Sequence, residues 1–163
     1  MNTLIEQENF FSLNTHKTKS EIRGLILRLQ DQMLSARDTG NFTEMDFPVR
    51  HFFAPGSYGR EMTLPAGGLI IGKIHKHAHL NIISKGHVSV LTEDGPVEFR
   101  GPCTFVSSPG TKRVVLVHEE TIWTTIHVTD ETDLEKIEDE VIAKNFDEVD
   151  ALEMTASIKG ELT

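Results

Sequence analysis

The stretch "GGLIIGKIHKHAHLNIISKGHVSVLTEDGPVEFR", residues 67–100, decides the fold. It consists of short runs of β-branched and other apolar residues, and turn-forming pairs rich in glycine separate these runs. No helical period interrupts them. The pair Asp94-Gly95 is typical of a tight hairpin, which would join residues 87–92 to residues 96–100. The stretch therefore predicts antiparallel strands and argues against a parallel α/β sheet.

The same rhythm continues on both sides of this stretch, with turn signals roughly every 8 to 12 residues. It predicts an antiparallel sandwich or barrel. The candidate strands are residues 49–53, 57–64, 69–75, 80–84, 87–92, 96–100, 103–107, 113–118 and 121–129.

An amphipathic helix is predicted on each side of the strands. In residues 18–37, Thr18 and Glu21 have the spacing of a capping box, and apolar residues recur at helical intervals after them. Residues 130–146 place five apolar side chains on one helical face, with acids in the first turn. Beyond Asp147 the sequence is polar and weakly patterned, which predicts a mobile tail. We expect one domain in three segments: a helical arm over 1–46, the β-barrel over 47–129, and an acidic helix and tail over 130–163.

Charge and cysteine content narrow the classes of function. The net charge is −9, and 12 of the 25 acids but only 3 of the 16 bases lie after residue 129. This acidic tail opposes binding to a phosphate backbone, so we expect no nucleic-acid partner. No apolar window is long enough to cross a bilayer, so no membrane association is expected. The single Cys103 and the absence of a signal peptide predict a cytoplasmic location.

Motifs of the common hydrolases and kinases are missing. The sequence contains no G-x-S-x-G elbow, no phosphate-binding glycine-rich loop before a helix, and no cysteine pair for zinc. These enzyme classes are therefore disfavoured.

The run "LPAGGLIIGKIHKHAHLNIISKGHVSVLTEDG" and the later run "GPCTFVSSPGTKRVVLVHEETIWTTIH" resemble the cupin superfamily, the RmlC-like jelly rolls. Phrases such as "GKIH", "HLNI", "PGTKR" and "WTTIH" are similar in particular to small cupin-like proteins of tailed bacteriophages and prophages. The likeness covers about 80 residues, half of the chain. It implies a double-stranded β-helix with the arm and the acidic helix at its ends. It also implies a homo-oligomer, most simply a dimer, and the host cytoplasm for a phage-encoded protein.

The first cupin motif, G-x5-H-x-H-x3/4-E-x6-G, fits the sequence without gaps. Its two glycines fall on Gly67 and Gly86, and its three ligand positions fall on Lys73, His75 and His79. Lysine thus replaces one histidine ligand, and histidine replaces the glutamate. In the second motif the histidine position is taken by Arg113, so His127 or His118, or His77 from the first run, would have to supply a third metal ligand.

Two kinds of site remain open. His75, His79 and His127 are the candidate ligands of one divalent transition metal ion such as Zn, Fe, Ni or Mn, and a barrel without any cofactor is equally compatible with the sequence. The ammonium of Lys73 would repel such an ion. Together with His75, His79 and Arg113, and with Arg60 from the strand before, Lys73 would instead suit an anionic small molecule.

Two functions follow from these sites. We favour an accessory phage or prophage cupin that binds a small, anionic ligand in its barrel, or a phage or host protein, without catalysis. The alternative is a metal-dependent cupin enzyme of the isomerase, epimerase or dioxygenase type. The fold alone does not choose between them, and no catalytic residue is assigned.

Overall fold

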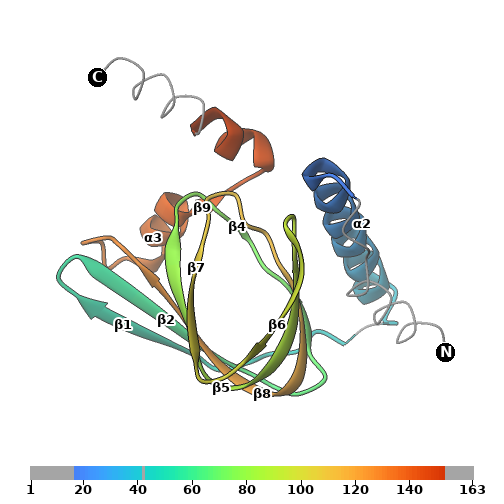
Figure 1. Ribbon diagram of the computed structural model, residues 1–163, viewed down its shortest axis with the longest axis horizontal. Helices are drawn as coiled ribbons and strands as arrows, with labels where there is room; N and C mark the ends of the chain where they lie inside the picture. The colour runs from blue at the N-terminus through green and yellow to red at the C-terminus, as the bar shows by residue number, and fades with distance from the viewer. Residues whose placement is uncertain (1–16, 42, 153–163) are drawn as a thin grey trace.

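The computed structural model describes residues 17–41 and 43–152 and is mainly β (Figure 1). The predicted arm before residue 17 and the predicted tail after residue 152 lie outside the described residues. The elements, in chain order, are α2 (Lys19–Asp38), β1 (Val49–Ala54), β2 (Ser57–Leu64), β3 (Leu69–Ile71), β4 (Ile74–His75), β5 (His79–Thr92), β6 (Gly95–Arg100), β7 (Cys103–Ser107), β8 (Val114–His127), α3 (Leu134–Val141) and β9 (Ile142–Ala143).

A seven-stranded antiparallel sheet curls into a roll (Figure 1). Its strand order is β1-β2-β8-β5-β6, with β3 also paired to β8 and β7 also paired to β5. The long strands β5 and β8 pair along most of their length and so hold the two halves of the roll together. β5 pairs with β7 through its first residues and with β6 through its last. The predicted antiparallel jelly roll with a helix at each end is confirmed.

β5 and β8 each replace two of the predicted strands. The sequence at residues 84–86 looks like a turn, but the chain continues through it as an irregular part of the β5–β8 pairing. Gly86 makes this possible, because it has φ +106° and a Cβ there would lie 2.2 Å from the hydroxyl oxygen of Thr121. The predicted hairpin is confirmed, with Thr92 paired to Gly95.

The core lies inside the roll. Alternate residues of the strands point inward, and the buried members form one cluster: Leu64, Ile83, Val88, Val90, Val115, Val117 and Trp123. α2 packs outside the roll, where its Ile22 and Ile26 contact Leu91 and Val114. The predicted capping box of Thr18 and Glu21 is present at its start.

The predicted C-terminal helix is shorter than the sequence indicates. α3 ends at Val141, and Ile142 and Ala143 are extended as β9, which pairs with β4. The expectation of one helix through residue 146 is therefore wrong. Pairing with β4 satisfies backbone groups that helix continuation would otherwise use, and residues 146–152 form a separate helical segment. α3 lies against one end of the roll (Figure 1), where Ile137 and Val141 pack on Tyr58.

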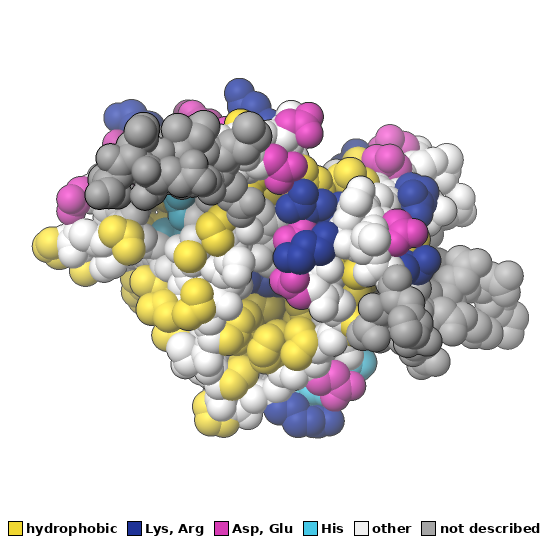
Figure 2. Space-filling model, turned by 45° about the horizontal axis from the view of Figure 1, so that its top comes forward, with side chains coloured by type: hydrophobic (Ala, Val, Ile, Leu, Met, Phe, Trp, Pro, Cys, Tyr) yellow, Lys and Arg dark blue, Asp and Glu magenta, His cyan; other side chains and the backbone are white. Residues whose placement is uncertain are grey.

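The outward face of the sheet also carries apolar residues. The register aligns Phe52, Gly59, Ile126, Leu80 and Val106 in one row across five strands. Hydrophobic side chains gather on the face of the molecule drawn in Figure 2, while charged side chains lie together elsewhere on it. Among the described residues, no helix is both long enough and apolar enough to cross a membrane.

Candidate metal and ligand site

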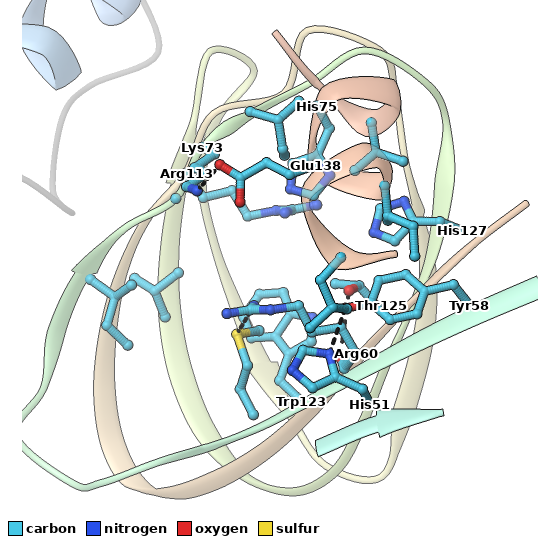
Figure 3. A pocket seen from close by; sticks show the side chains of 18 of the residues that line it. His51, Tyr58, Arg60, Lys73, His75, Arg113, Trp123, Thr125, His127 and Glu138 are labelled. Atoms are coloured by element: carbon cyan, nitrogen blue, oxygen red, sulfur yellow. Dashed lines mark hydrogen bonds and ion pairs between the residues drawn. The ribbon is translucent and has the colours of Figure 1, made fainter. Parts of the chain in front are cut away.

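A cavity of about 430 Å³ opens inside the roll and is closed on one side by α3 (Figure 3). Its walls come from β1, β2, β3, β4, β8, β9 and α3, and they combine apolar side chains with polar ones. The labelled polar and aromatic residues are His51, Tyr58, Arg60, Lys73, His75, Arg113, Trp123, Thr125, His127 and Glu138. Such a cavity is at the lower end of the size range of small-molecule sites.

Three histidines meet beside this cavity. His75 is the last residue of β4, His79 begins β5 and His127 ends β8. One ring nitrogen from each lies within 4.8 Å of one from each of the others. The register explains the meeting of His79 and His127: Leu80 pairs with Ile126 and both point outward, so the residues beside them project inward from neighbouring strands.

All three imidazoles are held neutral. Burial lowers the pKa of His75 to about 2, with further contributions from His79, Arg113, His127 and Arg60. Burial also lowers the pKa of His79 and that of His127 to about 4. A neutral imidazole keeps a free lone pair, which is the form that binds metal ions.

Two nitrogens of this cluster are without a hydrogen-bond partner. His75 Nδ1 and His79 Nε2 are both buried, and neither contacts a donor or acceptor among the described residues. The other nitrogen of His79 lies 3.2 Å from the carbonyl oxygen of His77, which orients the ring. Buried polar atoms are rarely left unpaired, so these two nitrogens are candidates for binding a ligand.

Arg113 lies deep beside the histidines and is held by a chain of polar side chains. Its guanidinium donates to the hydroxyl of Ser107, which also accepts from the Asn81 amide at 2.8 Å. The oxygen of that amide accepts from Trp123 Nε1 at 3.1 Å, and the guanidinium lies 5.6 Å from the Trp123 ring centroid. Burial lowers the pKa of Arg113 to about 10, so it remains charged at neutral pH.

The remaining predicted residues occupy different places. Arg60 points into the cavity from β2, and its guanidinium contacts the sulfur of Met62. Lys73 lies at the rim, where it pairs with Glu138 of α3 and its side chain is 59% exposed. The structure therefore places His75, His127, Arg60 and Arg113 in the cavity wall and Lys73 at its rim. His79 lies beside His75 and His127.

The other two candidate ligands lie elsewhere. His77 is exposed, and His118 points away from the cavity and contacts the hydroxyl of Ser89 at 2.7 Å. Among the alternatives that the sequence leaves open for a third histidine, only His127 joins His75 and His79.

Sequence reasoning missed Asn81 and Ser107. Asn81 is fully buried in an otherwise apolar run, two residues after His79 and therefore on the same face of β5. That period-two spacing is a signal that would have found it. Ser107 has no such signal, because only the pairing of β5 with β7 places it opposite His79.

A second polar pair lines the cavity next to His127. His51 Nδ1 lies 2.7 Å from the hydroxyl of Tyr58, and the Tyr58 ring stacks on that of His127 with 6.2 Å between centroids. Burial raises the pKa of Tyr58, so its hydroxyl stays protonated at neutral pH. This pair offers one hydroxyl that can form hydrogen bonds beside the histidines.

Comparison with known proteins supports the fold. No family model and no curated protein matches the chain. Ectoine synthase from P. lautus is similar in structure, with a TM-score of 0.50 and 9% identity over 63% of this chain and 78% of the other. A cupin-2 domain protein from Shewanella frigidimarina aligns over 62% and 99%, with a TM-score of 0.44 and 11% identity. An RmlC-like cupin from Methanocaldococcus jannaschii aligns over 55% and 87%, with a TM-score of 0.45 and 14% identity. The strand pairing and the likeness to ectoine synthase therefore agree on an antiparallel jelly-roll fold for this chain.

Proposed function

We propose that the roll binds one divalent transition metal ion on His75, His79 and His127 and presents it to a small molecule in the cavity. The observation that carries this proposal is the pair of buried, unpaired nitrogens on His75 and His79 beside a third imidazole. Leaving two such atoms unpaired costs free energy that a bound cation would recover.

The donor set fits a transition metal. Three neutral imidazoles suit Zn, Fe, Ni or Cu better than Mg or Ca, which prefer oxygen ligands. With three protein ligands, such an ion would still be able to bind a small molecule. When bound, such an ion acts as a Lewis acid on a small molecule. The residues around it would exclude water and orient that molecule, with the Tyr58 hydroxyl as one donor.

The sequence argument against a metal was the ammonium of Lys73. Its ion pair with Glu138 and its exposure weaken that argument, because a paired and hydrated charge at the rim repels a cation far less than a buried one does. Arg113 and Arg60 are the positive charges that remain near the histidines. A metal at this site therefore calls for an anion beside it.

Elemental analysis tests the proposal directly. Protein purified without a histidine tag should contain about one transition metal ion per chain. The His75→Ala and His79→Ala variants should lose it, whereas His118→Ala, which removes an exposed imidazole, should keep it. Metal-free protein that does not take up Zn²⁺, Fe²⁺ or Ni²⁺ in a dialysis titration would overturn the metal centre.

The finer expectations stay predictions. They are an accessory role in a phage or prophage, a phage or host protein partner, a dimer and a cytoplasmic location. Light scattering on the purified protein measures the mass of the assembly and so tests the dimer.

A further inference from the structure

The charge inside the cavity is unbalanced. Arg60 and Arg113 both line it, and neither forms an ion pair with any acid among the described residues. Arg113 is only 8% exposed. Buried cations are ordinarily paired, because an isolated charge in a protein interior is costly. The missing partner is therefore expected from outside the described chain.

The acid that lines the cavity already forms an ion pair with a lysine. Glu138 is the acid that lines the cavity, and its carboxylate pairs with Lys73 at the rim. Moving it to an arginine would break that ion pair. The two guanidiniums thus remain available to an anionic ligand.

Arg113 is also fixed in position. Ser107, Asn81 and Trp123 hold its guanidinium through the hydrogen-bonded chain and the ring contact described above. Its contact with Ser107 uses one of five N–H donors, so the planar fork keeps donors free for a second group. A guanidinium whose position is already fixed loses little entropy on binding a carboxylate in the bidentate manner.

Most of the surface that lines the cavity is apolar. Met62, Leu64, Ile70, Val115 and Trp123 line it, and Ile137 of α3 closes it. Hydroxyl groups of a sugar would find few partners on these side chains, and their burial without hydrogen bonds would be costly. A hydrocarbon body is favoured here because it removes apolar surface from water.

We propose that the ligand of this cavity is a small organic carboxylate with a hydrocarbon body, its carboxylate bound by Arg113 with Arg60 nearby and its body against the apolar wall. This inference deepens the proposed function, because it rests on the same cavity being a small-molecule site. It requires no metal, since the guanidiniums act whether or not the histidines carry an ion. It also narrows the ligand class given by the sequence, because it disfavours sugar acids and phosphate esters.

Comparing each carboxylic acid with its uncharged amide tests whether binding requires the negative charge of the ligand. The probes are benzoate with benzamide, cyclohexanecarboxylate with its amide, and hexanoate with its amide, together with gluconate and inorganic phosphate. Thermal shift identifies the best probe on the full chain, and calorimetry then measures its affinity. We expect at least one acid to bind and its amide to bind about ten- to hundred-fold more weakly, the effect of losing a charged hydrogen bond.

Variants locate the carboxylate. Arg113→Met should weaken binding of the best acid about ten- to hundred-fold and leave binding of its amide unchanged. Arg60→Met provides a second test that does not depend on the folding of the first variant, and we expect a smaller loss. Arg28→Met, which removes an exposed arginine from α2, is the matched control and should bind as the unchanged protein does.

Measuring metal content in every sample separates the two proposals. Acid binding that depends on Arg113 supports the carboxylate site even in protein that fails to take up metal in the titration, the result that overturns the metal centre. A metal-loaded protein for which no acid binds better than its amide overturns the carboxylate site and leaves the metal centre standing. Gluconate or phosphate binding more tightly than every hydrocarbon acid would overturn the assignment of the ligand body.

Discussion

Arg113 gives the sharpest test of the carboxylate site. A buried charge that serves to bind a ligand should lower the free energy of unfolding of the ligand-free protein. Its guanidinium is 8% exposed and has no acid partner among the described residues. Burial lowers its pKa from 12.5 to about 10, which means that the fold disfavours the charged form. We predict that Arg113→Met makes the ligand-free protein more stable.

The magnitude follows from the contacts. A fall of the pKa from 12.5 to about 10 corresponds to a cost of about 3 kcal/mol for keeping the charge inside at neutral pH. The substitution removes this cost and adds about 1.5 kcal/mol from burying the methionine. Against these gains stand about 2 kcal/mol for the hydrogen bond to Ser107 and about 1 kcal/mol for the contact with Trp123. The net gain is about 1 to 2 kcal/mol.

Urea unfolding of dialysed, ligand-free protein measures this difference. We expect the free energy of unfolding to rise by about 1 to 2 kcal/mol, and Tm by about 3 to 6 °C. Arg28→Met is the control and should stay within about 0.5 kcal/mol of the unchanged protein. A loss of more than about 1 kcal/mol in Arg113→Met would refute the reasoning, because the guanidinium would then be a structural partner of Ser107 and Trp123.

Three further predictions concern the rest of the molecule. The pKa values of the three clustered histidines lie at about 2 to 4 in the fold, below 6.5 in the unfolded chain, so the unfolded chain binds protons first. Their contribution is present above pH 6.5 and is lost as the pH falls toward the folded pKa values, and urea unfolding of metal-free protein should show a loss of about 5 kcal/mol between pH 7 and pH 5. A stability unchanged over that interval would mean that the imidazoles are hydrated. Ile26→Ala, at a fully buried position of α2, should cost about 2 to 4 kcal/mol without changing the metal content; a fall in metal content would link the arm to the site. Gly86→Ala should cost more than about 2 kcal/mol, because the added Cβ meets Thr121, whereas Gly95→Ala has a similar φ but open space and should cost about 1 kcal/mol; equal losses on urea unfolding would count against the close approach.

Much of the fold could be read from local sequence. The turn at Asp94-Gly95 and the capping box of α2 are short-range features, and the structure agrees with both. Local reading failed at residues 84–86 and at Ile142. In the first case Gly86 lies within the long strand β5 and does not end it. In the second, α3 ends before Ile142 because that residue pairs with β4. Both outcomes depend on a partner strand that is distant in the sequence.

The site divides in the same way. The spacing of His75 and His79 in the first motif was enough to nominate them, because residues in adjoining strands of a known pattern have predictable directions. His127 lies beside them because β8 pairs with β5. Lys73 lies at the rim, where it forms an ion pair with Glu138 of α3. The sequence by itself determined which side chains were available and where the strands turn. The tertiary structure alone decided which of them share the cavity and which charges stay unpaired, because burial and pairing depend on contacts between segments far apart in the chain.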